Sequence, residues 1–200
     1  GNGSGEVGPW STSANTTVSQ GGTRAVVKAR NFIYAIAGYD GSTESAVVEF
    51  APVLANGETG SWTATTALPR GVEGPAVSYY NGYLYVTGGA GAGADNTVYY
   101  GYVNLDGTVS SWTSTTVLPA NRDSHSSFAQ NGYLYVIGGY SGSNNQTTAY
   151  YAPINTNGSV GTWATTSPLP QRRGFADIEV ANGYVYWLGG SENAFNGTTH

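Results

Sequence analysis

A period of about 50 residues runs through the chain and constrains its fold more than any other feature. Tryptophans mark this period with gaps of 52, 50 and 51 residues, at Trp10, Trp62, Trp112 and Trp163. Each of the last three is followed six residues later by Leu-Pro, and then by Asn-Gly-Tyr and an apolar run that ends in two glycines, as in 134–139. The first copy of this run, 32–38, is eroded. Self-similarity at a fixed period is typical of repeat architectures, in which each repeat is one supersecondary unit.

Each repeat predicts four short antiparallel strands. Runs of Val, Ile, Tyr and Leu bounded by Gly, Asn and Pro indicate strands, and the chain shows no 3.6-residue period. Asn-Gly between two such runs predicts a tight hairpin, because a type I′ turn needs positive φ at both central residues. The glycine pair lets the backbone turn where Cβ atoms would clash. Four antiparallel strands per repeat correspond to one blade of a β-propeller.

The predicted fold class is therefore all-β, with four repeat equivalents of a four-stranded antiparallel blade. We divide the chain into an outer strand of a preceding blade in 1–24, blades over 25–75, 76–125 and 126–175, and a partial blade over 176–200. Trp112 and Trp163 are expected to be largely buried between blades. Because open sheet edges are rarely left exposed, we expect the chain to be part of a larger propeller. The alternatives are a closed four-bladed ring and two chains that pair into one ring.

The repeat resembles the kelch family of β-propellers. The family pattern has a Gly-Gly doublet after the second strand, a Tyr in the third, a Trp in the fourth and an Arg in the loop before the next blade. One copy here reads Gly88-Gly89, Tyr99-Tyr100, Trp112 and Arg122, and the next reads Gly138-Gly139, Tyr150-Tyr151, Trp163 and Arg172-Arg173. The chain looks closest to secreted bacterial kelch-like proteins, and the resemblance implies more blades than these repeats supply.

Composition narrows the range of partners. The chain has 12 acidic and 7 basic residues and a net charge of −5, so it offers no basic surface for nucleic acid. No stretch approaches the roughly 18 apolar residues of a membrane span, so no membrane insertion is expected. Abundant Thr, Ser and Tyr with few charges favour a secreted or cell-surface protein. Five N-x-S/T triplets are candidate glycosylation sites, at Asn2, Asn15, Asn145, Asn157 and Asn196.

Polar residues before each first strand are the candidate ligand site, because these loops would ring the mouth of a central funnel. They are Arg70 and Glu73, then Arg122, Asp123 and His125, then Arg172 and Arg173. Arg122 and Arg173 occupy equivalent positions, where two guanidinium groups would grip a carboxylate through parallel hydrogen bonds. The alternative is that each Arg braces a neighbouring blade by bonding loop carbonyls. Asp123 and His125 can also be interpreted as a general base and its orienting partner.

Tyr39 and Tyr140 follow the glycine pair in two repeats and are candidate loop contacts for a glycan or a protein. The chain has no Cys and 2 His, which excludes for this segment the copper chemistry of galactose oxidase, a kelch propeller. We expect no cofactor and no metal site. The expected function is a non-catalytic interaction module that binds a protein, a glycan or a copy of itself. The alternatives are a structural subunit of a surface layer or filament, and an enzyme of the mutarotase or lyase kind.

Overall fold

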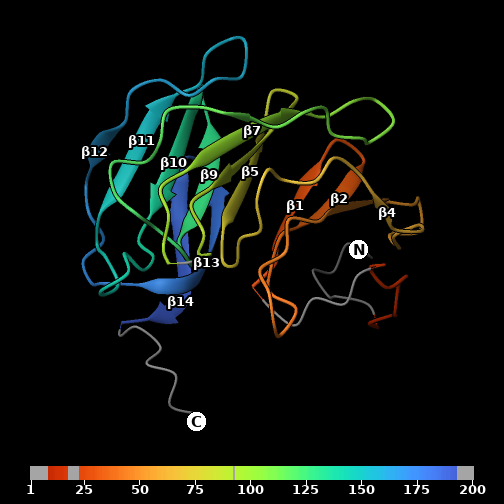
Figure 1. Cartoon of the computed structure of the whole chain (residues 1–200), viewed down its shortest axis with the longest axis horizontal. Helices are drawn as coiled ribbons and strands as arrows, with labels where there is room; N and C mark the ends of the chain where they lie inside the picture. Colours follow the sequence, from red (N-terminus) through yellow and green to blue (C-terminus); the bar gives the residue numbers. More distant parts are fainter. Residues whose placement is uncertain (1–8, 18–22, 92, 193–200) are drawn as a thin grey trace.

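The described part of the chain forms three four-stranded antiparallel sheets and one two-stranded hairpin (Figure 1). The structure is a computed structural model that describes residues 9–17, 23–91 and 93–192. Within these ranges the chain forms fourteen strands and no helix. The described residues accordingly include no helix long and apolar enough to span a membrane. The prediction of an all-β chain built from repeated antiparallel sheets is confirmed at this level.

The strands of each sheet follow one another in chain order. The first sheet consists of β1 (Ala25–Ala29), β2 (Phe32–Ile36), β3 (Val48–Pro52) and β4 (Thr63–Ala64). The second consists of β5 (Ala76–Tyr80), β6 (Tyr83–Thr87), β7 (Val98–Tyr102) and β8 (Thr113–Ser114). The third consists of β9 (Ser126–Gln130), β10 (Tyr133–Ile137), β11 (Ala149–Pro153) and β12 (Ala164–Thr166). The terminal hairpin consists of β13 (Gly174–Ala181) and β14 (Tyr184–Ser191).

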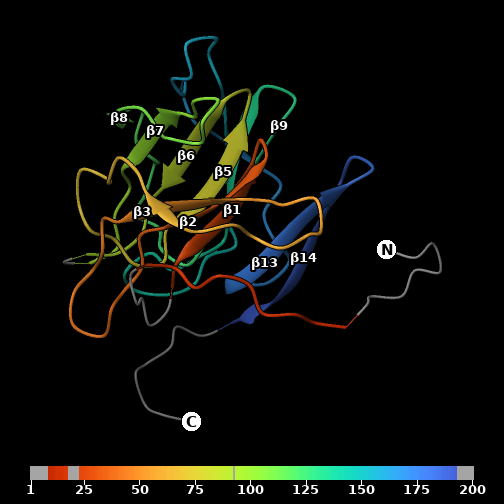
Figure 2. The ribbon, with the colours of Figure 1, turned by 90° about the vertical axis from the view of Figure 1, so that its right-hand side faces the viewer.

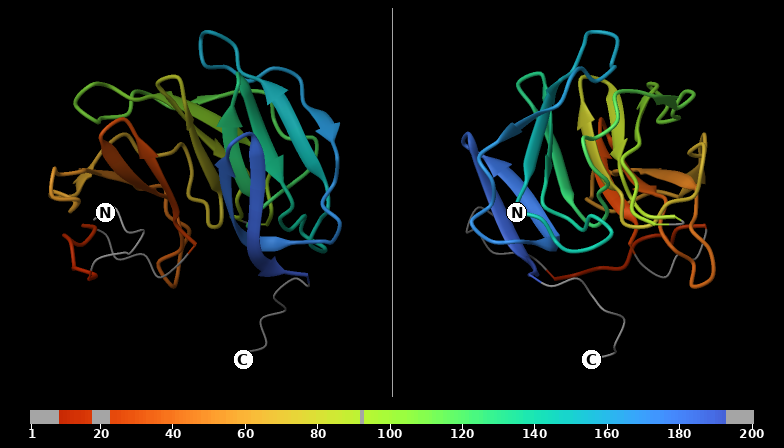
Figure 3. Two further views of the ribbon diagram at one scale, coloured as in Figure 1. Left: turned by 180° about the vertical axis from the view of Figure 1, so that it is seen from behind. Right: turned by 60° about the vertical axis from the view of Figure 1, so that its left-hand side comes forward.

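The sheets succeed one another across the molecule in sequence order, with their first strands side by side. Strand β1 contacts β5, β5 contacts β9, and β9 contacts β13. Figure 2 shows β1 beside β5, and Figure 3 shows the sheets following one another from the first sheet to the terminal hairpin. The first strands of all four units therefore face a shared region of the molecule.

Asn-Gly turns join the first two strands, as the sequence predicts. At Asn131 and Gly132 the φ angles are 51° and 81°, and the pairs at 81–82 and 182–183 also have positive φ at both residues. Positive φ at both central residues is what a two-residue type I′ hairpin requires. In the first sheet Arg30 takes the place of the Asn, with φ of 53°. The eroded first repeat therefore keeps the left-handed conformation at this residue without the usual Asn.

The glycine doublet at Gly138 and Gly139 is a place where the surrounding chain leaves no room for a side chain. Gly138 and Gly139 have φ angles of 63° and 81°. A Cβ on Gly139 would lie 2.5 Å from Cβ of His125 and 2.6 Å from the carbonyl oxygen of Asp123. The Gly139 amide donates to the carbonyl of Arg173 at 2.7 Å. The doublet therefore lets the loops before two successive first strands pack against the backbone.

Hydrophobic clusters fill the space between the facing surfaces of neighbouring sheets. One cluster contains Tyr34 of β2 and Leu84 of β6. The next contains Tyr85 of β6 together with Leu134 and Tyr150 of the third sheet. Burial of apolar surface stabilises by about 25 cal/mol per Å², so these faces contribute most of the free energy that holds the sheets together.

The repeated tryptophans lie just before the short fourth strands and are partly buried, and Trp112 and Trp163 pack against the clusters between sheets, as the sequence predicts. The fourth strands are two or three residues long and exposed, which leaves one side of each indole in contact with solvent. The other side packs against the clusters between sheets. Trp10, which precedes the first sheet, is 93% exposed.

A pair of polar contacts, which we call the latch, ties each sheet to the segment before it. Nε1 of Trp62, Trp112 and Trp163 donates to the carbonyl of Ala14, Thr66 and Thr116, at 2.9, 2.8 and 3.0 Å respectively. Beside it, the hydroxyl oxygen of Ser13, Thr65 and Thr115 accepts from the amide of Thr59, Val109 and Val160, at 2.8, 2.8 and 2.9 Å respectively. The latch therefore recurs at each of the three four-stranded sheets.

Candidate binding groove at the first strands

A row of backbone hydrogen bonds aligns the first strands. The amide of Gly74 donates to the carbonyl of Thr23 at 3.2 Å, Ser124 donates to Gly74 at 2.8 Å, and Phe175 donates to Ser124 at 2.8 Å. All four residues have left-handed φ angles, between 49° and 58°. Each lies shortly before its first strand or, for Phe175, at its start. This row fixes the spacing of the four strands through the main chain.

The first strands line a groove of about 490 Å³. Residues of β1, β5, β9 and β13 all contribute to its wall. Two smaller hollows of about 310 and 270 Å³ continue it toward the backbone row. Because all four units supply lining residues, the groove depends on the arrangement of the sheets and not on one repeat.

The wall of the groove combines hydroxyl, amide, aromatic and charged groups. Ser78 and Ser127 are buried and their hydroxyl oxygens lie 2.7 Å apart. Tyr79 and Gln130 also line the groove, and both are half-buried. Lys28 on β1 and Glu179 on β13 are exposed lining residues of opposite charge. Such a surface can donate and accept hydrogen bonds and present an aromatic ring to one ligand.

Arg122 and Arg173, the predicted carboxylate clamp, are absent from the wall of this groove. Arg122 is 2% exposed, its Nη1 donates to the carbonyl of Asn121 at 2.7 Å, and its guanidinium lies over the ring of Tyr150. Arg173 donates to the carbonyl of Arg172 and to Oε1 of Gln171. Both side chains are engaged within their own sheet or loop, so the arrangement contradicts a shared clamp. The physical reason is that buried cation–π and carbonyl contacts hold Arg122 inside the third sheet.

The main chain has the same role in each repeat at the position that Arg122 and Arg173 occupy. The carbonyls of Val72, Arg122 and Arg173 accept from Gly38, Gly89 and Gly139, at 2.9, 2.8 and 2.7 Å respectively. Val72 supplies no polar side chain and is 2% exposed. A position that is occupied by Val as well as by Arg serves the packing of the loops, and its main-chain carbonyl, not the Arg side chain, makes the bond to the neighbouring sheet.

His125 and Asp123 do not form the predicted base and orienting partner. Nε2 of His125 lies 2.8 Å from the hydroxyl of Thr87, and its Nδ1 has no hydrogen-bond partner among the described residues. Burial, helped by the charge of Arg122, lowers the pKa of His125 to about 3. Burial and the charge of Glu73 raise the pKa of Asp123, although a bond from Ser124 opposes this. His125 lines the two smaller hollows as a neutral residue, whereas Asp123 lines none of the three spaces.

The other predicted funnel residues hold loops or face solvent. Nη2 of Arg70 lies 2.6 Å from Oδ2 of Asp95 in an ion pair between two loops of the second sheet. Burial alone would raise the pKa of Asp95, but hydrogen bonds from Thr97 and the charge of Arg70 together lower it. Glu73 pairs through its backbone with Ala90. Arg172 is exposed. The predicted funnel residues therefore do not converge on one space.

Tyr39 and Tyr140 are half-buried on the loops after β2 and β10. Tyr39 makes an isolated backbone bridge with Glu44, and Tyr140 makes such bridges with Asp123 and Asn145. Their backbones hold loops together while part of each ring reaches the surface. A role in ligand contact stays a prediction for both.

The sequons differ in accessibility. Asn15 and Asn157 are exposed, whereas Asn2 and Asn196 lie outside the described residues. Asn145 is 0% exposed, and its Nδ2 donates to the carbonyl of Ser191 at 2.7 Å. A glycan cannot be attached to a side chain enclosed in this way, so Asn145 is withdrawn as a candidate for modification of the folded protein.

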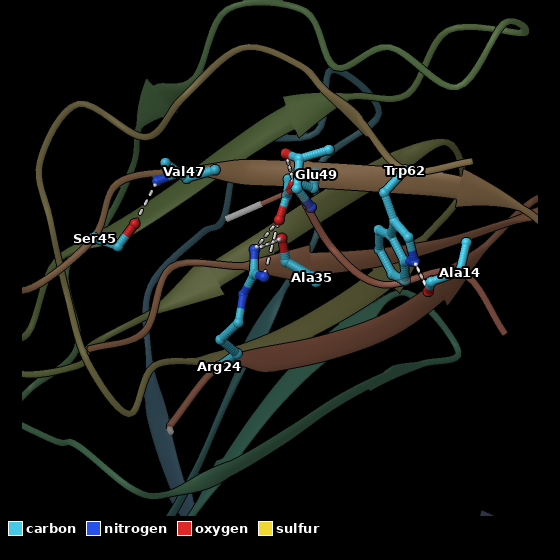
Figure 4. A network of polar contacts seen from close by, with 8 residues as sticks. Ala14, Arg24, Ala35, Ser45, Val47, Glu49 and Trp62 are labelled. Atoms are coloured by element: carbon cyan, nitrogen blue, oxygen red, sulfur yellow. Dashed lines mark hydrogen bonds and ion pairs between the residues drawn. The ribbon is translucent and has the colours of Figure 1, made fainter. Parts of the chain in front are cut away.

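A buried ion pair in the first sheet was not foreseen from the sequence (Figure 4). Nη1 and Nη2 of Arg24 donate to Oε2 of Glu49 at 3.0 and 2.9 Å, and Nη2 also donates to the carbonyl of Ala35. The other carboxylate oxygen accepts from the amide and hydroxyl of Thr17. Burial would raise the pKa of Glu49, but the bonds from Thr17 and Arg24 together lower it. The sequence feature that indicates this ion pair is Glu49, a lone charged residue in an otherwise apolar strand.

Comparison with known proteins adds no identification. No protein-family model and no curated protein matches the chain. Among the described residues, no three or more His, Cys, Asp or Glu side chains are grouped so as to hold a metal ion. The geometry of the groove is therefore the basis for a functional proposal.

Proposed function

We propose that the chain is a kelch-type β-propeller segment that binds a ligand without transforming it, with the groove at the first strands as the binding site. The observation that carries this proposal is that all four first strands contribute to a single groove of about 490 Å³. Pockets of this size, with a few convergent polar groups, are the usual form of small-ligand sites. The repeated four-stranded sheets and their glycine doublets support the assignment to kelch-type blades.

The ligand class that suits this wall is a glycan. Tyr79 offers a partly exposed aromatic ring, and Gln130 offers an amide that can donate and accept. Lys28 and Glu179 add one cationic and one anionic group. A sugar ring presents hydroxyl groups beside C–H surface, so it can use both the polar and the aromatic parts of such a wall. A secreted or cell-surface protein, which the composition favours, would meet glycans there.

Binding without reaction is favoured by the state of two titratable residues beside the groove, His125 and Arg24. His125 is neutral at ordinary pH and bonded to Thr87. Arg24 is saturated by Glu49 and Ala35 through its Nη atoms. General acid–base catalysis needs a group whose pKa lies near the working pH and whose proton can reach the ligand. Neither residue meets both requirements.

A panel of galactose-, mannose- and sialic-acid-terminated oligosaccharides tests this proposal by isothermal titration calorimetry. We expect at least one class to bind, and Gln130→Ala and Lys28→Ala to weaken that binding by about two- to tenfold, as loss of one hydrogen bond implies. Arg172→Ala, an exposed change outside the groove, is the matched control and should leave affinity unchanged. Lys28 is the only lysine in the chain, so a bound sugar should also protect its amine from acylation. If no sugar binds, or if all three variants behave alike, the groove is not a glycan site.

A further inference from the structure

The groove and the two smaller hollows together form one continuous space along the first strands, which we call the channel. The groove and the hollow of about 310 Å³ share Val77, Ser127 and Ile178 as lining residues. That hollow and the one of about 270 Å³ in turn share Pro75 and Asp177. The channel therefore runs from the hairpin-turn ends of the first strands to the backbone row.

Strand β13 gives the length of the channel. Every residue from Phe175 to Val180 lines the groove or one of the two hollows. At about 3.3 Å per residue along a strand, this stretch is about 17 Å long. A β-1,4-linked sugar advances its chain by about 5 Å, or about one and a half strand residues. The channel therefore matches a chain of about three linked rings in length.

An aromatic side chain lies at each end of the channel. Phe175 lines the hollow beside the backbone row and is 45% exposed. Tyr79 lines the groove at the opposite end and is half-buried. Because the C–H face of a sugar ring is apolar, it can pack on an aromatic ring while the hydroxyl groups at its edge bind polar partners. Two aromatic side chains so far apart suit a chain of sugar rings better than a single ring.

Polar side chains between the two aromatic rings can bind the sugar hydroxyl groups. Asp177 lines both hollows, Glu179 lines the groove, and both are exposed. They are two residues apart on one strand, so their side chains lie on the same face of β13. A carboxylate accepts strong, charge-assisted hydrogen bonds from hydroxyl groups. Gln130 adds an amide at the groove end.

The charges along the channel favour a neutral chain. Arg24 is held in a buried ion pair, and Lys28 is the one other Lys or Arg among the described residues that line the channel. Asp177 and Glu179 supply two negative charges. A chain with a carboxylate on every ring would bring like charges close to both of them, which is unfavourable.

We propose that the channel holds a linear, neutral, β-1,4-linked oligosaccharide of at least three rings, which lies along the first strands with one ring on Phe175 and another on Tyr79. Hydroxyl groups between these two rings donate to Asp177 and Glu179. An extended β-1,4-linked chain follows the extended strands, whereas an α-1,4-linked chain curls away from them. This inference rests on the proposed function and specifies the length, shape and charge of the glycan.

Titration calorimetry of the whole chain with cello-oligosaccharides of one to six glucose rings tests the dependence on length. We expect affinity to rise by about tenfold or more between one and four rings, as a second aromatic contact and further hydrogen bonds imply. Affinity should then level off, because longer chains extend beyond the channel.

Variants at the end of the channel test the second aromatic contact. Phe175→Ala should weaken binding of the four-ring chain by about two- to tenfold, as loss of an aromatic contact implies. Phe175→Tyr, which keeps the ring, should bind like the wild type. Tyr184→Ala removes an exposed aromatic side chain of β14 outside the channel. It is the matched control and should leave affinity unchanged.

Two further tetrasaccharides separate charge from shape. A β-1,4-linked glucuronic acid tetramer should bind about tenfold more weakly than cellotetraose, as close like charges imply. Asp177→Asn should recover part of that difference. Maltotetraose, which is neutral and α-1,4-linked, should also bind more weakly than cellotetraose.

Equal affinity for one and four rings would overturn the channel proposal and leave the glycan groove in place. A loss in Phe175→Ala no larger than that in Tyr184→Ala would do the same, as would equal binding of the acidic and neutral tetramers or of the two linkage types. If no sugar of any length binds, the proposed function fails together with this inference.

Discussion

The first and third sheets share one strand plan but fill two corresponding interior positions with different chemistry. Glu49 of β3 takes the place that Tyr150 holds in β11, and Arg24 takes the place of His125 before the first strand. In the first sheet the two residues form a buried ion pair. In the third sheet a neutral imidazole bonds to Thr87 and the tyrosine ring lies under Arg122.

This difference shows that the repeat determines where these side chains lie but does not determine whether they are charged or neutral. A buried carboxylate needs a cation and hydrogen bonds to offset its desolvation. The first sheet accordingly has a charged residue at both positions, and Thr17 is a further donor to Glu49. The third sheet keeps both positions neutral and contacts the second sheet through His125 and Thr87. The following four predictions test this contrast.

Glu49→Gln should have the largest effect, because it leaves Arg24 buried without its anion. We expect a loss of about 3–5 kcal/mol in the free energy of unfolding, measured by urea denaturation. Glu58→Gln, an exposed change in the same sheet, should cost less than about 0.5 kcal/mol. Pairing Glu49→Gln with Arg24→Met should recover part of the loss. Equal effects of Glu49→Gln and Glu58→Gln would remove the distinction between the two sheets.

Gly139→Val should destabilise by about 2–4 kcal/mol, from left-handed strain and overpacking. Its new Cβ would meet His125 and the carbonyl of Asp123, so the neutral arrangement of the third sheet depends on this glycine. Gly132 has the same φ of 81° with open space around it. Gly132→Val therefore isolates the cost of backbone strain, about 1–2 kcal/mol. Thermal unfolding of both variants compares the two costs, and a Gly139→Val melting temperature equal to wild type would refute the packing argument.

Acid should weaken the third sheet before the first. The folded pKa of His125 is about 3, below its unfolded value of about 6.5. The unfolded state therefore binds more protons between these values, and stability falls by about 1.4 kcal/mol per pH unit as pH drops below 6.5. The pKa of Glu49 is lowered in the folded protein, so its carboxylate stabilises the fold at neutral pH. This stabilisation declines only as the pH falls below 4.5.

Urea denaturation at pH values between 7 and 5 measures this loss of stability. His125→Gln should flatten the pH dependence in that range, whereas Glu49→Gln should leave its slope unchanged. A wild-type protein whose stability is constant from pH 7 to 5 would contradict a buried neutral His125.

Ala37→Gly should give the smallest effect, and the opposite sign. Ala37 has φ of 59° where the third sheet has Gly138 at 63°, so relief of left-handed strain should stabilise the first sheet by about 0.5–1 kcal/mol. Ala35→Gly, within β2, is the control and should destabilise by at least a similar amount. A shift of the urea midpoint in the same direction for both variants would show that strain at Ala37 is negligible.

The sequence predicts the repeated elements well because their signals are local. The strands β5 and β9 begin where the predicted blades begin and end at Asn-Gly turns, and β10 lies between such a turn and a glycine pair. The predicted site fares worse because it depends on where side chains from different repeats point. Arg122 was assigned to a funnel, and only Val72 at the corresponding position hinted that this position is interior.

The groove and the ion pair were missed for the same physical reason. Ser78 and Ser127 meet because first strands of neighbouring sheets lie side by side, a contact that no local pattern encodes. Asn145 is a candidate glycosylation site by its sequence, but in the fold it is buried and bonds to Ser191 of the terminal hairpin. The part of Trp112 that stays exposed reflects the shortness of β8, which the length of the repeat does not reveal.

The backbone row ahead of the first strands has a consequence for how such a protein can diversify. Its links are made by amides and carbonyls, and the four positions already carry Thr23, Gly74, Ser124 and Phe175. All four residues line the same hollow, so the four positions border one opening. Substitution at these positions can change the size and polarity of that opening while the hydrogen bonds that space the strands stay the same. Selection for a new ligand can therefore act on this rim separately from selection for folding.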